Sequence, residues 1–580
     1  MLNQSLKNKL LVLGAIIFSI NTISAQEEDN LGTEVVNIVK PYSPTISDAF
    51  KVKENPLIND STNTKKKEVN YSIFSVPVAS TFTPAKRKAT SIEKIKPLKL
   101  YDNYATFGIG NYTNVLAEFY SNFEISSTDN FGLFFKHNSS QGGIKNVLLD
   151  DKFYDTQLEG NYTSRQKDLN YDISAGIKHQ LFNWYGLNSL YNTAPPEIIN
   201  SIDAKHSYFS GFAEGSLMME DSYFEKGTAS ISYLGDSFSS SEFNIKVKPE
   251  FGFDVIDFPL KIGVDIDYLS GKFKRNYSNT SDIKYSFLNA GIIPSYDYST
   301  EDLSLSVGFG AYVSLNAEES ETNFYVYPKF EVSYRLVDEL LMVYGGIDGS
   351  LAQNSYNNFK EENPFVSPTL HIQPTSELYN GFAGLKGKLS NVIGYNVRAS
   401  YSKEDDKALF ISNYYKGQSA GNEGYENGNS FAIVYDDHET ISFFGELIFD
   451  VSTNFYLGIN GTYNSYEIKY EIEPWNLPTI EATLFTTFNI TDKFYGGASL
   501  FFVGERNDLF SSSIGILSDI EVITLDSYFD ANAHIGYRFN KQLSIFVKGS
   551  NLFGDNYQKW ANYKVQGIQG MLGASYKFDW

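Results

Sequence analysis

The stretch Leu260-Lys261-Ile262-Gly263-Val264-Asp265-Ile266-Asp267-Tyr268 alternates apolar and polar residues without a break. Successive side chains of a β-strand point to opposite faces, so this segment places large apolar side chains on one face and mostly charged ones on the other. The pattern predicts a strand between two different surroundings. Similar alternation recurs from residue 101 to the end of the chain, for example at Val115–Ile125, Leu303–Val313 and Phe324–Leu336.

The connections between these predicted strands fall into two classes. Roughly every second one is tight and polar, and ten such turns imply about 22 strands. Many of the intervening connections are long, namely Tyr185–Lys205, Asn354–Leu378, Glu404–Ser430 and Arg506–Asp519. The tight turns are Ser127–Asn130, Lys167–Asn170, Glu220–Asp221, Asp257–Pro259, Glu301–Asp302, Val337–Glu339, Ser390–Asn391, Thr453–Asn454, Thr491–Lys493 and Asn540–Gln542.

Short turns on one side, long loops on the other and an even strand number are typical of an outer-membrane β-barrel. A soluble β-sandwich, propeller or β-helix also alternates, but no blade motif repeats here. A soluble protein also rarely places large apolar residues on the outward positions of some twenty strands. We therefore predict an all-β fold, a transmembrane antiparallel barrel of about 22 strands over residues 101–580.

The first 25 residues are typical of a secretory signal peptide. Lys7 and Lys9 precede the apolar run Leu10–Ile20, and Ala25 provides a small residue at the cleavage position. The run is too short to span a bilayer as a helix. We expect an exported protein, in the outer membrane of a Gram-negative bacterium.

Residues 26–100 differ from the strand array that follows. They contain 12 Lys and Arg against nine Asp and Glu, with the basic residues gathered in the second half, as in Lys65-Lys66-Lys67 and Lys86-Arg87-Lys88. Six prolines interrupt any regular element, at positions 41, 44, 56, 77, 84 and 97. The sequence predicts a mostly extended periplasmic leader with short strand-like pieces at Glu34–Val39 and Tyr71–Val78 rather than a compact domain.

Composition excludes several classes of function. The chain has no cysteine and a formal net charge of −22, which argues against thiol chemistry and against phosphate-mediated nucleic-acid binding. The six histidines form no HExxH motif, and His438 beside Asp436 and Asp437, with Asp405-Asp406 nearby, lacks the spacing of a calcium loop. We expect no enzyme activity, no catalytic or metal site and no cofactor.

The end of the chain resembles the barrel of TonB-dependent receptors. The resemblance rests on the strand number and on the segment Asn551-Leu552-Phe553-Gly554-Asp555-Asn556-Tyr557 before the final hairpin. It implies energised uptake of a scarce ligand across the outer membrane. The short stretch Glu34-Val35-Val36-Asn37-Ile38-Val39 is similar to the strand that such receptors offer to TonB. The sequence departs from the family because only the leader precedes the barrel, where a family member carries a globular plug.

The last strand alternates up to a terminal aromatic residue, through Leu572, Ala574, Tyr576, Phe578 and Trp580. In the barrels that it resembles, such a strand is recognised by the barrel assembly machinery. Besides that machinery and the outer-membrane lipid, we expect TonB or other envelope proteins as partners and no nucleic acid. Two hypotheses remain: receptor-like passage of a ligand, or a non-transporting accessory or scaffold barrel that docks partners through residues 26–100 and its loops.

Overall fold

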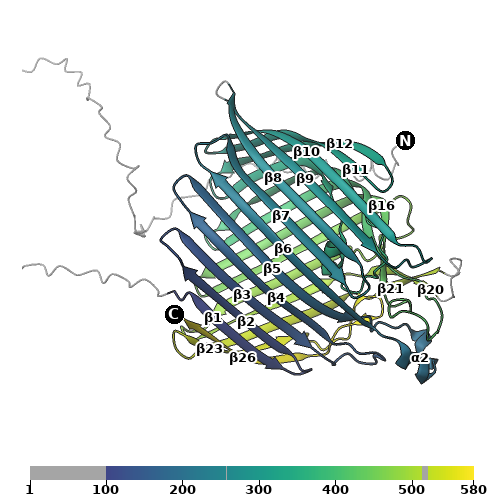
Figure 1. The fold of residues 1–580 in the computed structure, drawn as a ribbon. Coiled ribbons are helices and arrows are strands. Elements are labelled where there is room, and N and C mark those ends of the chain that lie inside the picture. The colour runs from purple at the N-terminus through teal and green to yellow at the C-terminus, as the bar shows by residue number, and fades with distance from the viewer. Residues whose placement is uncertain (1–99, 256–257, 512–519) are drawn as a thin grey trace, which may run out of the picture. The chain divides into compact units, whose positions relative to one another are not determined.

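The chain folds into a barrel of 22 antiparallel strands, as predicted (Figure 1). The computed structural model describes residues 100–255, 258–511 and 520–580. Strand β1 pairs with β2 on one side and with the last strand, β26, on the other, so that Asn103 lies opposite Phe578 and Gly110 opposite Met571. This pairing closes the sheet and satisfies the backbone groups of both terminal strands.

The barrel strands follow each other in chain order, with small elements inserted into four of the connections. The barrel strands are β1 (Asn103–Gly110), β2 (Val115–Glu124), β3 (Asp129–Ser140), β4 (Phe153–Arg165), β5 (Leu169–Asn183), β6 (Lys205–Met219), β7 (Phe224–Asp236), β8 (Ser241–Val255), β9 (Phe258–Phe273), β10 (Ile283–Ser299), β11 (Leu303–Asn316), β12 (Glu321–Val337), β13 (Leu341–Ala352), β14 (Thr375–Ser390), β15 (Ile393–Ser412), β16 (Phe431–Ser452), β17 (Phe455–Ile468), β18 (Ile480–Asn489), β19 (Phe494–Val503), β22 (Tyr528–Arg538), β23 (Leu543–Ser550) and β26 (Gln569–Phe578). The inserted elements are the 3-10 helix η3 (Ser189–Thr193), the helices α2 (Pro196–Ser201) and α3 (Tyr356–Glu362), and the strands β20 (Arg506–Ser511), β21 (Ile520–Leu525), β24 (Gln558–Trp560) and β25 (Tyr563–Lys564).

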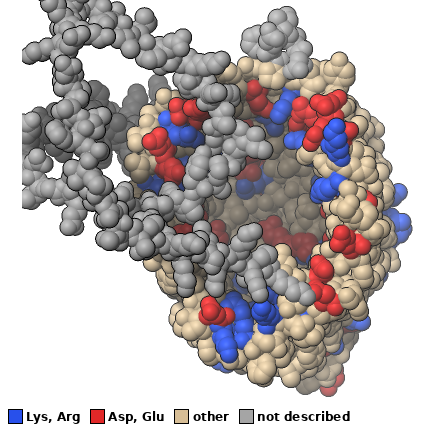
Figure 2. Space-filling model, turned by 90° about the vertical axis from the view of Figure 1, so that its left-hand side faces the viewer, with Lys and Arg blue, Asp and Glu red and all other residues tan. Residues whose placement is uncertain are grey.

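All ten predicted tight turns connect consecutive barrel strands at one end, which we call the turn end. The chain terminus Trp580 lies at the same end, while the long connections lie at the opposite end, which we call the loop end (Figure 1). Viewed from the turn end, the barrel is hollow, and Lys, Arg, Asp and Glu side chains line its rim and inner wall (Figure 2).

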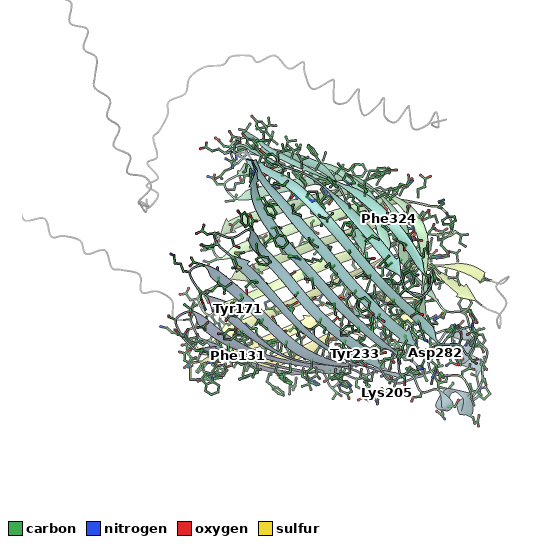
Figure 3. The ribbon with its side chains drawn as sticks, turned by 45° about the horizontal axis from the view of Figure 1, so that its top comes forward. Phe131, Tyr171, Lys205, Tyr233, Asp282 and Phe324 are labelled. Atoms are coloured by element: carbon green, nitrogen blue, oxygen red, sulfur yellow. The ribbon has the colours of Figure 1, made fainter. Side chains whose placement is uncertain are left out.

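The two faces of the wall have the chemistry that the alternation predicts. On the outer face, Ile173, Ile231, Phe443 and Val547 are between 42% and 55% exposed, which is where acyl chains would contact them. Labelled examples of this face are Phe131 and Tyr233 (Figure 3). The inner face carries ion pairs between neighbouring strands, including Lys248–Asp265 at 3.0 Å, Lys246–Asp267 at 3.1 Å and Lys261–Asp297 at 3.1 Å.

Two details of the sequence prediction need correction. Residues 404–412 belong to β15 rather than to a long loop, and β14 already begins at Thr375. Asp405-Asp406 and Asp436-Asp437 are therefore on adjacent strands, β15 and β16. No helix among the described residues is long and apolar enough to cross a membrane. The signal peptide, the leader and Glu34–Val39 lie outside the described residues.

The outer face gives a direct test of membrane insertion. We expect Ile266→Arg, near the middle of β9, to lower the free energy of unfolding by about 2–4 kcal/mol, because a guanidinium at bilayer depth is poorly solvated. Urea unfolding of the protein folded into lipid vesicles measures the change. The matched control is Lys261→Arg on the inner face of the same strand, where the charge stays in the solvated lumen. Equal losses for both variants would contradict a lipid-facing position for Ile266.

Candidate functional site

The long connections at the loop end fold inward and share one hydrophobic core, which we call the loop core. Its connection residues include Tyr356, Phe359 and Val366 between β13 and β14, and Trp560 and Tyr563 between β23 and β26. Wall residues complete it: Tyr208, Leu234, Leu269, Phe273, Tyr285, Phe287, Phe410, Phe431 and Ile433. Because these wall residues belong to β6–β10 on one side and β15–β16 on another, the loop core reaches across the lumen.

Helix α3 lies in the β13–β14 connection and is held at its N-terminus by the barrel wall. Ser355 caps the helix by accepting a hydrogen bond from the Asn358 backbone N–H at 3.1 Å. The carboxylate of Glu242 on β8 accepts the Tyr356 and Asn357 backbone N–H groups at 2.6 and 3.0 Å, and the Tyr285 hydroxyl donates to it at 2.8 Å. A wall carboxylate thus satisfies the free N–H groups of the first helical turn.

The other end of α3 carries a buried lysine. Lys360 is 1% exposed, and its Nζ donates to the Gln180 side-chain oxygen on β5 and to Glu361 Oε1, both at 2.5 Å. Lys178, also on β5, donates to Glu361 at 3.0 Å. Burial lowers the pKa of Lys360, and the charge of Glu361 partly offsets this effect. Lys360 is buried whereas Glu361 is partly exposed, and leaving a buried ammonium without its acceptors is costly, so these contacts fix α3 against the wall.

The remaining connections lock onto α3 and its flanking residues. Trp184 Nε1, between β5 and β6, donates to the Phe365 carbonyl at 3.0 Å, and the Tyr563 hydroxyl donates to the Asn429 carbonyl. Phe365 stacks on Tyr563 with ring centroids 3.7 Å apart. Connections that are far apart in the sequence therefore form one interlocked layer.

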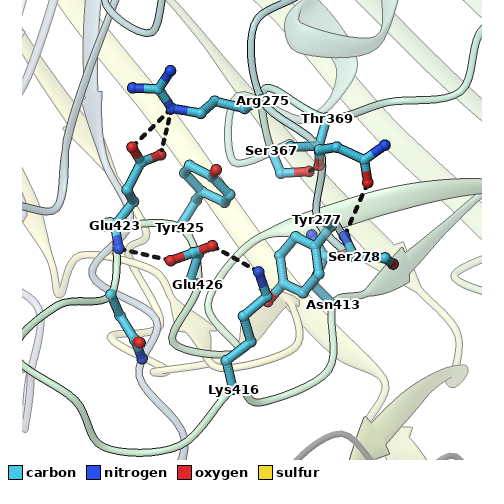
Figure 4. Close-up of polar contacts among 12 residues, drawn as sticks. Arg275, Tyr277, Ser278, Ser367, Thr369, Asn413, Lys416, Glu423, Tyr425 and Glu426 are labelled. Carbon is cyan, nitrogen blue, oxygen red and sulfur yellow. Dashed lines mark hydrogen bonds and ion pairs between the residues drawn. The ribbon is translucent and has the colours of Figure 1, made fainter. Parts of the chain in front are cut away.

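A polar cluster joins the β9–β10 connection to the β15–β16 connection (Figure 4). Arg275 Nε donates to both carboxylate oxygens of Glu423 at 2.8 and 2.9 Å, and Lys416 pairs with Glu426 at 2.7 Å. The Lys416 ammonium also lies 4.4 Å from the ring centroid of Tyr277. These contacts extend the interlocked layer to the rim beside β9 and β10.

The hairpin of β20 and β21 is outside the barrel sheet and docks on the end of β15 through a buried carboxyl group. Asp508 is fully buried and accepts hydrogen bonds from the backbone N–H and the hydroxyl of Ser412, both at 3.0 Å. Burial raises the pKa of Asp508 to about 6, although these hydrogen bonds favour the charged form. Arg506 of the same strand donates to the carbonyls of Gln558 and Lys559 and thereby ties the hairpin to β24.

A pocket of about 570 Å³ opens among the loop-end connections and is a candidate ligand site. Its only charged lining residues are Lys145 and Lys564, and neither makes an ion pair within the described part of the chain. Amide side chains and one phenol also line the pocket, from Asn146, Asn188, Asn192, Gln558, Asn562 and Tyr185. On a protein of net charge −22, a pocket with two free cations and many amides suits a small anion rich in hydrogen-bonding groups.

A second cavity, of about 800 Å³, lies against the inner wall of the lumen. Both basic and acidic side chains line it, among them Lys226, Lys248, Glu250, Asp265 and Lys329. The ion pairs in this cavity are partly exposed to solvent, and the positive and negative charges within each pair cancel. The cavity is therefore hydrophilic but does not favour a ligand of one sign of charge.

The structure places the other residues singled out in the sequence without bringing them to one site. Leu572 and Tyr576 lie on the outer face of β26 at 57% and 46% exposure, and Ala574 and Phe578 belong to the same alternating row; Trp580 follows the strand and is 78% exposed. Asp436 accepts three backbone N–H groups, from Lys469, Tyr470 and Glu471, and acts as a local cap. Among the described residues, no group of three His, Asp or Glu side chains is placed to hold a metal ion. The pocket residues gave no sequence signal, because they come from three separate connections.

Comparison with known proteins finds likeness in structure alone. No family model matches the sequence, and no curated protein matches it. The siderophore receptor PirA from Acinetobacter baumannii aligns at a TM-score of 0.61 and 14% identity, over 83% of this chain and 81% of that chain. The chain has the barrel fold of siderophore receptors. The resemblance to TonB-dependent receptor barrels is thereby confirmed for the fold.

Two further structures agree. The ferripyoverdine receptor of the outer membrane of Pseudomonas aeruginosa aligns at a TM-score of 0.60 and 13% identity, over 83% of this chain and 72% of that chain. The FrpB iron transporter from Neisseria meningitidis aligns at a TM-score of 0.63 and 9% identity, over 83% of this chain and 82% of that chain. At these identities the similarity concerns architecture, and this chain is an outer-membrane-type barrel.

The loop core can be tested at the cap of α3. We expect Glu242→Gln to destabilise residues 353–374 by about 2 kcal/mol, because two backbone N–H groups lose a charged acceptor. Hydrogen–deuterium exchange of this segment measures the opening. Glu214→Gln on the inner face of β6 is the control and should leave its exchange unchanged. Unaltered exchange in Glu242→Gln would show that the cap does not hold the loop.

Asp508 predicts a pH dependence of the β20–β21 hairpin. Its pKa is about 6 when folded and 3.8 ordinarily, so ionisation disfavours the docked hairpin by about 3 kcal/mol above pH 6. This penalty disappears as the pH falls from 6 to 4, and protection of the hairpin from hydrogen exchange should rise over that window. Exchange rates are corrected for their intrinsic pH dependence. Asp508→Asn should abolish the change, and a pH response that persists in Asp508→Asn would assign it to another group.

Proposed function

We propose that this chain is an outer-membrane receptor that captures a small anionic chelate or similar ligand at the loop end and passes it through the barrel with energy from TonB. The observation that carries the proposal is the loop-end pocket, which Lys145 and Lys564 line without an ion-pair partner among the described residues. Its setting supports the proposal, because siderophore receptors share this barrel fold. A ferric siderophore is accordingly the first ligand class to test.

The interlocked loops favour uptake over a purely accessory function. A barrel of 22 strands about 4.8 Å apart and tilted about 40° is roughly 40 Å across, and an unfilled lumen of that width would breach the membrane. Here the loop core reaches across the lumen, so the chain supplies its own barrier at the loop end. A partner is not needed to fill that end, which weakens the main reason for an accessory or scaffold barrel.

The TonB step is tested by deleting residues 34–39. We expect uptake of radiolabelled ferric siderophores by intact cells to fall at least about tenfold, because the strand offered to TonB is lost. Binding to de-energised cells should be unchanged, since the loop-end pocket is intact. The matched control deletes residues 61–66, which shortens the leader by the same length but leaves the Glu34–Val39 segment in place. Normal uptake after deletion of 34–39 would contradict TonB dependence.

A second variant tests ligand binding at the pocket separately from the TonB step. Lys145→Gln with Lys564→Gln removes both cations but keeps hydrogen-bonding side chains, so binding itself should fall. Unchanged binding in this variant would contradict the pocket as the capture site. The accessory function would replace uptake if two results are obtained together. None of the ferric siderophores tested binds, and deletion of residues 61–100 releases envelope proteins that co-purify with the barrel in stoichiometric amounts.

A further inference from the structure

Strand β12 has unequal neighbours on its two sides. Its pairing with β11 runs from Glu321 to Tyr334, whereas its pairing with β13 covers only Lys329–Val337. Within the described part of the chain, Glu321–Pro328 therefore has a strand partner on one side alone. This half of β12 is at the loop end of the barrel, away from the tight turn that joins β12 to β13.

Local sequence explains why the pairing stops. Pro328 has no N–H group, and proline in a sheet is confined to positions that need no ladder bond. On the other strand, the pairing of β13 with β14 is irregular between Asp348 and Ser350, immediately after the last pair with β12, Lys329 with Asp348. The chain then enters the connection that carries α3, so β13 leaves β12 to reach the loop core.

The open edge presents backbone groups in a defined register. The Arg335 N–H donates toward β11, to the Asp302 carbonyl. In an antiparallel strand alternate residues bond to the same side, so odd-numbered residues of β12 serve β11 and even-numbered residues serve the other edge. The N–H and C=O groups of Thr322, Phe324 and Val326 consequently point to the open edge, and Pro328 ends the row.

The side chains beside this edge are apolar and unusually exposed. Phe324 lies on the outer face at 78% exposure (Figure 3), and Val326, two residues further along the same face, is 72% exposed. Ile109 is an outward residue near the loop end of β1, where both neighbouring strands are paired, and it is 56% exposed. An open strand edge beside apolar side chains is a template for another strand, and proteins usually cover or charge such edges.

The charges around the open edge are negative. The β11–β12 connection carries Glu318 and Glu319, and Glu321 begins β12; none of the three makes an ion pair among the described residues. Glu318 shares a hollow with Lys272 and Lys284, so the excess charge belongs to Glu319 and Glu321. Asp405 of β15 lies opposite Ser376 of β14, and the Ser376 hydroxyl is 2.9 Å from the Tyr327 hydroxyl of β12, so Asp405 and its neighbour Asp406 add negative charge beside this half of β12.

We propose that the open edge of β12 binds an extended, lysine- or arginine-bearing segment of a partner protein, which adds to the barrel as a further strand over Glu321–Val326. Main-chain hydrogen bonds to Thr322, Phe324 and Val326 provide the affinity, as in other cases of strand addition. Apolar residues of the segment lie beside Phe324 and Val326, and its basic residues face the acidic rim. This docking site is independent of the pocket lined by Lys145 and Lys564.

The test uses a fluorescent ten-residue probe peptide of alternating Lys and Val and the purified full-length barrel in detergent. We expect saturable binding that is at least about tenfold tighter than that of the matched Glu–Val peptide, because the rim is acidic. Val326→Pro removes an N–H that the β11 ladder does not use, and should weaken binding about tenfold. Val326→Thr keeps that N–H and should stay within about threefold. Equal binding of both peptides, or full binding by Val326→Pro, would overturn the proposal.

A second measurement tests the proposal even if Val326→Pro does not fold. A photoreactive phenylalanine analogue at Phe324 should cross-link the Lys–Val peptide, whereas the same analogue at Ile109 should not. Cross-linking of equal yield at both positions would indicate non-specific adsorption and overturn the site. Cross-links between two barrels without peptide would replace the partner by a second copy of this chain.

Discussion

The whole architecture depends on backbone hydrogen bonding in a medium that supplies none. A strand in hydrocarbon must pair on both sides, and only closure of the sheet achieves this for the first and last strands. The pairing of β1 with β26, residue by residue from Asn103 to Gly110, is therefore the contact that makes every other strand viable. Once the sheet is closed, alternation assigns each side chain to lipid or lumen, and the connections are free to differ between the two ends.

The loop end uses that freedom to build an interior. Its connections carry aromatic residues that would be costly to expose, and these residues bury one another across the lumen. Polar side chains of the inner wall hydrogen-bond to these connections at the loop end: Glu242 accepts from the start of α3, and Gln180 accepts from Lys360. The layer is assembled from several connections, so it is coupled to the wall at many points.

The fold was predictable because the decisive signals are local. Period-two alternation and ten polar turns sufficed for the strand number and for the face of each strand. The alternation fades where strands extend beyond the lipid, because both faces then meet water, and Asp405-Asp406 was assigned to a loop for that reason. The loop core was not predictable, since contacts such as Phe365 with Tyr563 join residues about two hundred positions apart. The pocket lacks a motif for the same reason.

Closure by the final strand also has a consequence for biosynthesis. Trp580, the last residue, donates from Nε1 to Ser121 at 3.0 Å, and Asp579 accepts the Asp102 backbone N–H at 3.1 Å. The first strand of the barrel is thus completed by its last strand in chain order. A chain that stops before β26 keeps two unpaired edges and has no membrane-compatible state. Insertion of the closed barrel therefore cannot be completed before β26 has been synthesised.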